Sequence, residues 1–132
     1  MTRVVFACVH NAGRSQMAAA FFNGRADLGK ARAESAGTAP SSQVHPVVVD
    51  AMREVGIDLS AAEPRRLTPA LAAGATWLVT MGCGDECPVV PGVRREDWAL
   101  DDPATQPPAR VRRIRDEIRA HVERFVDREG LR

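Results

Sequence analysis

Patterns typical of short buried strands alternate with helical patterns along the whole chain of 132 residues. A run of β-branched and aromatic residues comes first, and apolar residues at helical spacing follow it. The order then repeats, with Gly or Pro marking most of the ends. The predicted strands are residues 4–7, 31–36, 76–80 and 98–100, and the predicted helices are residues 15 to about 29, 46–56, 69–73 and 110 onward.

This alternation predicts a three-layer α/β fold. A strand, a crossover helix and the next strand form a right-handed βαβ unit, which gives a parallel sheet with helices on both faces. No linker, internal repeat or low-complexity segment interrupts the pattern. We therefore expect one domain that spans residues 1–132, a length usual for a single core.

Composition excludes several classes of protein. The 18 basic and 17 acidic residues leave a net charge of +1, which is not the basic surplus of a nucleic-acid-binding protein. No apolar run approaches the ~18 residues of a spanning helix, so we expect no membrane association. Three cysteines are an odd number, which does not suit a structural disulfide framework. We expect a cytoplasmic protein whose cysteines do chemistry or bind metal.

Chemically active residues follow three of the predicted strands. Cys8 follows the first strand, Cys83 follows the strand at 76–80, and Asp102 follows the strand at 98–100. Ligands of open parallel sheets bind beyond the carboxyl ends of the strands. The topology therefore predicts that these distant residues meet at one edge of the sheet, which makes that edge the candidate active site.

The segment after the first strand has the composition of an anion-binding loop. Cys8 and Arg14 stand in a C-x5-R spacing between a strand and a helix. Backbone N–H groups of such a loop form a nest for an oxyanion, and an arginine adds a planar fork that grips two oxygens. The predicted oxyanion-binding residues are Val9, His10, Asn11, Ala12, Gly13, Arg14 and Ser15.

Cys8 is the predicted nucleophile at the bottom of this loop, since the positive field of the loop favours the thiolate. The Ser15 hydroxyl is placed to donate to that thiolate. The alternative is a buried structural cysteine followed by a helix-capping Ser15. Asp102 is the predicted general acid, because the following Pro103 holds it in an extended conformation. The alternative is a plain Asp-Pro turn. Asp101 should point the other way along the strand.

Cys83 and Cys87 lie in a turn-rich segment, which predicts a mobile loop rather than packed core. Two thiols near a reactive thiolate suggest a relay. Cys83 would attack an intermediate bound to Cys8, and Cys87 would take the disulfide outward. The alternative is a zinc site made of Cys8, His10, Cys83 and Cys87. We expect no metal, and isolated His45 and His121 are interpreted as structural.

The chain also resembles the arsenate reductases built on the low-molecular-weight tyrosine phosphatase fold. The matching segments are residues 8–18, 35–38, 54–58, 80–88, 98–103 and 112–118. The resemblance implies a flavodoxin-like sheet with strand order 2-1-3-4. It implies that Cys8 attacks arsenate, which phosphate or sulfate can mimic, while Arg14 and the loop bind it and Asp102 is the acid. Cys83 then forms a disulfide with Cys8, and Cys87 leaves a Cys83–Cys87 bridge.

The resemblance implies no bound cofactor and an external reductant. That reductant is thioredoxin, or, as the alternative, mycothiol with mycoredoxin, in which case Cys83 and Cys87 are dispensable. Two features depart from the best-known relatives. The segment between the second and third cysteines is shorter, and Ala19 stands where those relatives have a glutamate ligand to potassium, so we expect no potassium site. We expect a monomer.

Two other functions remain open at this point. A phosphatase would share the first step and let water finish it. Phosphatase relatives carry aromatic residues after the Asp-Pro pair, whereas Ala104 and Thr105 follow here and the chain has no tyrosine. A zinc-stabilised binding module is the hypothesis from a different class.

Overall fold

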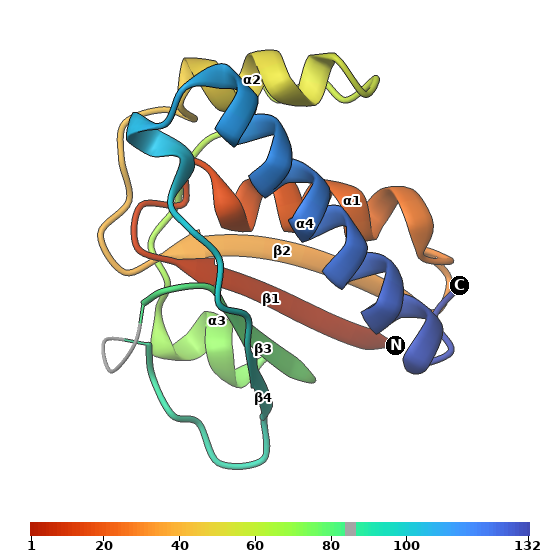
Figure 1. Cartoon of the computed structure of the whole chain (residues 1–132). Coiled ribbons are helices and arrows are strands. Elements are labelled where there is room, and N and C mark those ends of the chain that lie inside the picture. The colour runs from red at the N-terminus through yellow and green to blue at the C-terminus, as the bar shows by residue number, and fades with distance from the viewer. Residues whose placement is uncertain (84–86) are drawn as a thin grey trace.

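The computed structural model describes residues 1–83 and 87–132, and its centre is a four-stranded parallel sheet (Figure 1). The strands are β1 (Thr2–Cys8), β2 (Ala31–Gly37), β3 (Trp77–Thr80) and β4 (Arg94–Asp97). Their order in the sheet is β2-β1-β3-β4, and each pair of neighbours is parallel. The predicted flavodoxin-like order 2-1-3-4 is confirmed.

Helices cover both faces of the sheet, which confirms the three layers. Figure 1 shows α1, α2 and α4 on one face and the short α3 on the other. The helices are α1 (Arg14–Arg25), α2 (Pro46–Arg53), α3 (Pro69–Ala73) and α4 (Pro108–Arg128), and a 3-10 turn, η2, covers Pro103–Thr105. Within the described residues, no helix combines the length and apolar character that crossing a membrane requires.

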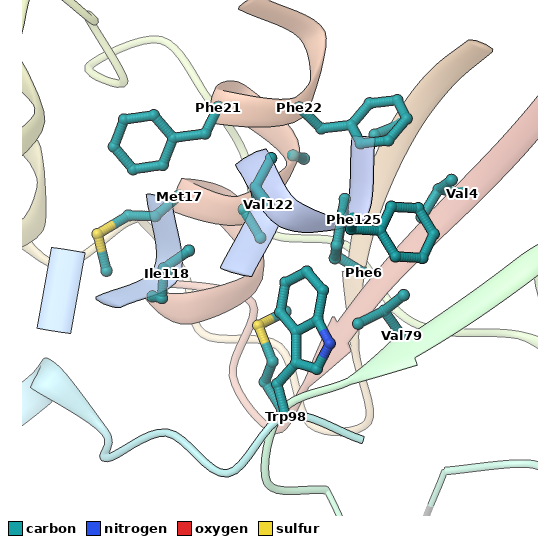
Figure 2. Close-up of a cluster of buried hydrophobic side chains, with 14 of the residues drawn as sticks. Val4, Phe6, Met17, Phe21, Phe22, Val79, Trp98, Ile118, Val122 and Phe125 are labelled. Carbon is teal, nitrogen blue, oxygen red and sulfur yellow. The ribbon is translucent and has the colours of Figure 1, made fainter. Parts of the chain in front are cut away.

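Strand β1 divides its side chains between two apolar clusters, one on each face. Val4 and Phe6 join the cluster under α1 and α4, whereas Val5 and Ala7 join the cluster on the side of α3. The alternation follows from the two-residue period of a strand. Because both faces are covered, the strand reads in sequence as a continuous apolar run. Figure 2 shows the larger cluster, in which Phe22 lies near Phe6 and Phe125.

The fourth strand is the main correction to the predicted elements. Residues 98–100 were expected to form it, but β4 is Arg94–Asp97. Trp98 follows its end, where its N–H still donates to the carbonyl oxygen of Thr80 at 2.9 Å, and both Trp98 and Leu100 are buried. The ring of Trp98 packs against Phe6 and Phe125 (Figure 2). An edge strand pairs on one side only and tolerates charged side chains. The apolar pattern therefore marked the buried residues that follow the strand, of which only Trp98 still bonds to β3.

Most other boundaries moved by a few residues. The Pro69–Ala73 helix ends at Gly74, as predicted, while α4 begins at Pro108, two residues earlier than expected. The first two helices are shorter than predicted and end at Arg25 and Arg53. Despite these shifts, β1 and β3 still run parallel, so the residues that follow them lie at the same edge of the sheet.

Candidate active site at the carboxyl ends of the strands

The Arg14 guanidinium joins the segments that follow three strands. Arg14 is the first residue of α1, directly after the Cys8 loop, and only 7% of it is exposed. Its Nη1 donates to the carbonyl oxygen of Leu100 at 3.1 Å, and its Nη2 lies 3.7 Å from Oδ2 of Asp102. Gly82, which follows β3, packs against the same guanidinium. Segments that follow β1, β3 and β4 therefore meet at Arg14, while the approach of Cys83 to Cys8 stays a prediction.

The Cys8 loop turns its carbonyl groups toward a second segment, residues 37–45. Backbone N–H groups of that segment donate to four carbonyl oxygens of the loop, and the Gln16 side chain donates to a fifth, that of Asn11 at 3.2 Å. The four backbone bonds are Thr38 to Cys8, Ala39 to Val9, Ser41 to His10 and His45 to Ala12, at 2.8–3.1 Å.

The N–H groups of the loop are left available. Within the part of the chain that the structure describes, the N–H groups of residues 9–13 have no acceptor. Unpaired backbone donors that precede a helix form a site for an oxyanion. The close approach of residues 37–45 depends on Gly37, because a Cβ there would lie 2.5 Å from the carbonyl oxygen of Val9.

The Cys8 sulfur lies at the start of this loop and carries a free thiol, with only 2% of the residue exposed. Its Sγ is 2.9 Å from Oγ of Ser15, and the hydrogen bond between them is buried. Nδ2 of Asn11 donates to the same Oγ at 2.7 Å. The Ser15 oxygen is thus used as an acceptor, which leaves its hydrogen free to donate to Cys8.

The orientation of Asn11 follows from its other partners. Its Oδ1 accepts from the backbone N–H of Arg65 at 2.9 Å and from Nε2 of Gln16 at 3.2 Å. Because an N–H can only meet the oxygen end of the amide, Nδ2 must face Ser15. Asn11 is fully buried and has a φ of 50°, an uncommon conformation for a residue other than glycine.

Asp102 lies at the mouth of the loop with its backbone extended, as the following proline predicts. Oδ1 accepts from the N–H of Ala104 at 3.0 Å and caps η2. Oδ2 faces Arg14 and also lies 4.0 Å from Nδ1 of His10. The side chain is 42% exposed, so solvent can reach it. Asp101 pairs with Arg110 instead, although the strand whose alternation was expected to turn it away ends at Asp97.

Cys83 and Cys87 are joined by a disulfide, with their Cα atoms 5.6 Å apart. Both are buried beside Val5, Ala7 and Leu78, so the prediction that they lie outside packed core is wrong for these two residues. The residues between them, 84–86, lie outside the described residues, and the predicted mobility of that segment falls there. The two cysteines pack among apolar residues although turn-forming residues flank them in sequence.

Metal binding finds no support in this arrangement. The zinc alternative needs Cys83 and Cys87 as ligands, yet the two are bonded to each other. Among the described residues, no three His, Cys, Asp or Glu side chains group closely enough to bind a metal ion. His121 stacks on Trp98, and burial, with a smaller contribution from Arg124, lowers its pKa below the ordinary value. Its surroundings fit the structural interpretation.

Sequence reasoning missed two residues of the site. Gln16 lies in the first turn of α1, and its buried Nε2 reaches Asn11 and the carbonyl oxygen of Glu63 at 3.3 Å. Gly82 contacts Arg14 across more than sixty residues of chain. No local pattern predicts the contact of Gln16 with Glu63 or that of Gly82 with Arg14, because both depend on how distant segments pack.

The chain belongs to the low molecular weight phosphotyrosine protein phosphatase family, whose sequence model matches residues 3–131. Several arsenate reductases are among the relatives that it resembles. It is 38% identical over 130 residues to arsenate reductase 1 of Staphylococcus epidermidis, covering 95% of this chain and 96% of the relative. The expected family is thereby confirmed.

Solved structures agree with this assignment. A thioredoxin-dependent arsenate reductase from Corynebacterium glutamicum superposes with a TM-score of 0.86 at 35% identity and covers 99% of this chain. This chain spans 63% of that protein's length. A structure described as an arsenate reductase in the phosphate binding state gives a TM-score of 0.83 at 32% identity, covering 97% of this chain and 98% of that one.

Proposed function

We propose that this protein is an arsenate reductase that uses Cys8 as the nucleophile. The observation that carries the proposal is the buried Cys8 thiol, hydrogen-bonded to Ser15 at the start of a loop whose N–H groups at 9–13 meet no acceptor among the described residues. Arg14 and Asp102 at the mouth of that loop would bind a tetrahedral oxyanion and supply a proton. The similarity to arsenate reductases points to arsenate as that oxyanion.

In the first step, the Cys8 thiolate attacks arsenic and forms an S–As bond. Arg14 and the N–H groups of residues 9–15 neutralise the negative charge of the bound arsenate, because donors aimed at developing charge lower the barrier most. One As–O bond breaks, and Asp102 protonates the departing oxygen, which leaves as water. The 42% exposure of Asp102 allows it to recover a proton from solvent.

In the second step, the Cys83 thiolate attacks Sγ of Cys8. A Cys8–Cys83 disulfide forms, the electron pair of the S–As bond stays on arsenic, and arsenic(V) becomes arsenic(III), released as arsenite. Cys87 then attacks Cys83, which frees the Cys8 thiolate and leaves a Cys83–Cys87 disulfide. The present structure has this last pairing, with Cys8 free, which matches the end state of the proposed sequence.

The reductant of the Cys83–Cys87 disulfide is proposed to be thioredoxin, as for the C. glutamicum relative. Mycothiol with mycoredoxin is the alternative, in which the small thiol attacks the Cys8 adduct directly. We further propose a monomeric, cytoplasmic enzyme of one domain, residues 1–132. Light scattering would measure the oligomeric state.

Mass spectrometry of disulfides after arsenate treatment tests the proposal. The reduced protein with arsenate should accumulate a Cys8–Cys83 bridge in the Cys87→Ser variant and a Cys83–Cys87 bridge in the wild type. A mixed disulfide between Cys8 and added mycothiol, with turnover intact in Cys83→Ser and Cys87→Ser, would instead establish the mycothiol route.

Two controls separate the remaining functions. Cys8→Ser should lose arsenate turnover and keep its fold. Fast hydrolysis of an aryl phosphate that survives the loss of both Cys83 and Cys87, with no arsenate-dependent loss of thiols, would identify a phosphatase and contradict the proposal.

A further inference from the structure

The position of the Arg14 guanidinium depends on a residue outside the Cys8 loop. Nη1 of Arg14 donates to the carbonyl oxygen of Leu100 at 3.1 Å. The same Nη1 lies against Gly82, the second residue after β3 and the residue before Cys83. Gly82 has a φ of +93°, a conformation that side-chain-bearing residues rarely adopt.

The contact between Gly82 and Arg14 is closer than a side chain would allow. A Cβ on Gly82 would lie 2.4 Å from Nη1 of Arg14 and 3.3 Å from its Cζ. Ordinary van der Waals contact begins at 3.4 Å, so the guanidinium would have to move by about 1 Å. The end of an arginine moves more readily than the backbone, and the displaced group would therefore be the proposed oxyanion ligand.

We propose that Gly82 is a positioning residue for Arg14, and that its bare Cα sets where the guanidinium meets the oxyanion. This inference rests on the proposed role of Arg14 in oxyanion binding. A guanidinium binds a tetrahedral oxyanion through two parallel N–H···O bonds, so its position and plane must match the anion. A shift of about 1 Å breaks that match, and displacements of this size cost as much as a hundredfold in rate.

The chain provides a matched control. Gly92 lies in the same connection between β3 and β4 and has a similar φ of +84°, but a Cβ there would meet no atom within 4 Å. Alanine at either position suffers the strain of a positive φ. Only alanine at position 82 also meets Arg14.

The test compares Gly82→Ala with Gly92→Ala by calorimetric titration with inorganic phosphate and by steady-state arsenate kinetics. Both variants should lose thermal stability through the positive φ, and Gly82→Ala should lose more than Gly92→Ala because its Cβ also meets Arg14. Gly82→Ala should bind phosphate about ten- to a hundredfold more weakly, the effect of losing one hydrogen bond to a charged group, while Gly92→Ala stays within about twofold of wild type. The KM for arsenate should rise in the same proportion. Equal phosphate affinities in the two variants would overturn the proposal.

A double-variant cycle covers the case in which Gly82→Ala folds poorly. Once the guanidinium is removed by Arg14→Ala, adding Gly82→Ala should cost no more stability than adding Gly92→Ala. A larger cost in that background would show that Gly82 does not act through Arg14, and would refute the inference. A wild-type protein that binds neither phosphate nor arsenate would instead refute the proposed function. The stability cycle would still test whether Gly82 contacts Arg14.

Discussion

Replacing Ser15 with alanine tests how the Cys8 thiolate is stabilised. The Ser15 hydroxyl lies 2.9 Å from Sγ of Cys8, and Asn11 occupies its oxygen as a donor, so its hydrogen is directed to the sulfur. A hydrogen bond to a charged group contributes about 1.5–3 kcal/mol. Since about 1.4 kcal/mol corresponds to a factor of ten, Ser15→Ala should reduce the thiolate population about ten- to a hundredfold at a pH where the thiol predominates.

The assay is the rate at which iodoacetamide alkylates Cys8 across a pH series, with the Cys83–Cys87 disulfide kept oxidised so that one thiol reacts. At low pH, Ser15→Ala should be alkylated more slowly than the wild type. The two rates should converge at a pH where Cys8 is fully ionised. Ser42→Ala, an exposed serine of the segment beside the loop, is the control and should leave the profile unchanged. A wild-type profile in Ser15→Ala would refute the hydroxyl's role as donor.

Three further predictions concern the acid, the helix interface and the core. Asp102→Asn should lower kcat for arsenate about 10²–10⁴-fold while calorimetry finds sulfate bound at least as tightly, and an unchanged kcat would exclude Asp102 as the acid. Hydrogen bonds from Arg112 and Arg115 hold the pKa of Glu54 below its ordinary value, so its contribution to stability is present above that value and lost as pH falls. Glu54→Gln should therefore lower Tm at neutral pH, with the difference from wild type narrowing in acid; a constant difference would contradict this. Phe22→Ala should cost about 3–5 kcal/mol in denaturant unfolding, because Phe22 is fully buried, and a cost below about 1 kcal/mol would contradict its place in the core.

Local patterns predicted the framework of the fold and the residues of the Cys8 loop. The apolar run of β1 and the apolar residues at helical spacing in α4 can be read directly from the order of residues. Strand, helix and their order could therefore be inferred without tertiary contacts. The same holds for Pro69 and Gly74, which mark the ends of α3. The extended backbone of Asp102 followed from its proline neighbour.

The edge strand was beyond such reasoning for a physical reason. Arg94–Asp97 pairs with β3 through backbone groups, which every residue carries. The types of its side chains therefore do not indicate that it is a strand. Trp98 and Leu100 carry a strong apolar signal, but that signal reports burial and not hydrogen bonding. The pattern therefore located a buried segment correctly but placed the strand about four residues too late, with only the Trp98 N–H still bonded to Thr80 of β3.

What the amino-acid sequence determined by itself is the chemistry: a thiol, a guanidinium, a carboxyl group and two further thiols, each placed after a particular strand. Only the tertiary structure decided how these groups are held. Gln16 orients Asn11, Gly82 leaves room for Arg14, and apolar packing buries the Cys83–Cys87 disulfide. Apart from the pair of Gln16 and Asn11, these contacts join residues far apart in the chain, and their geometry depends on the packing of the whole domain, which no local pattern encodes.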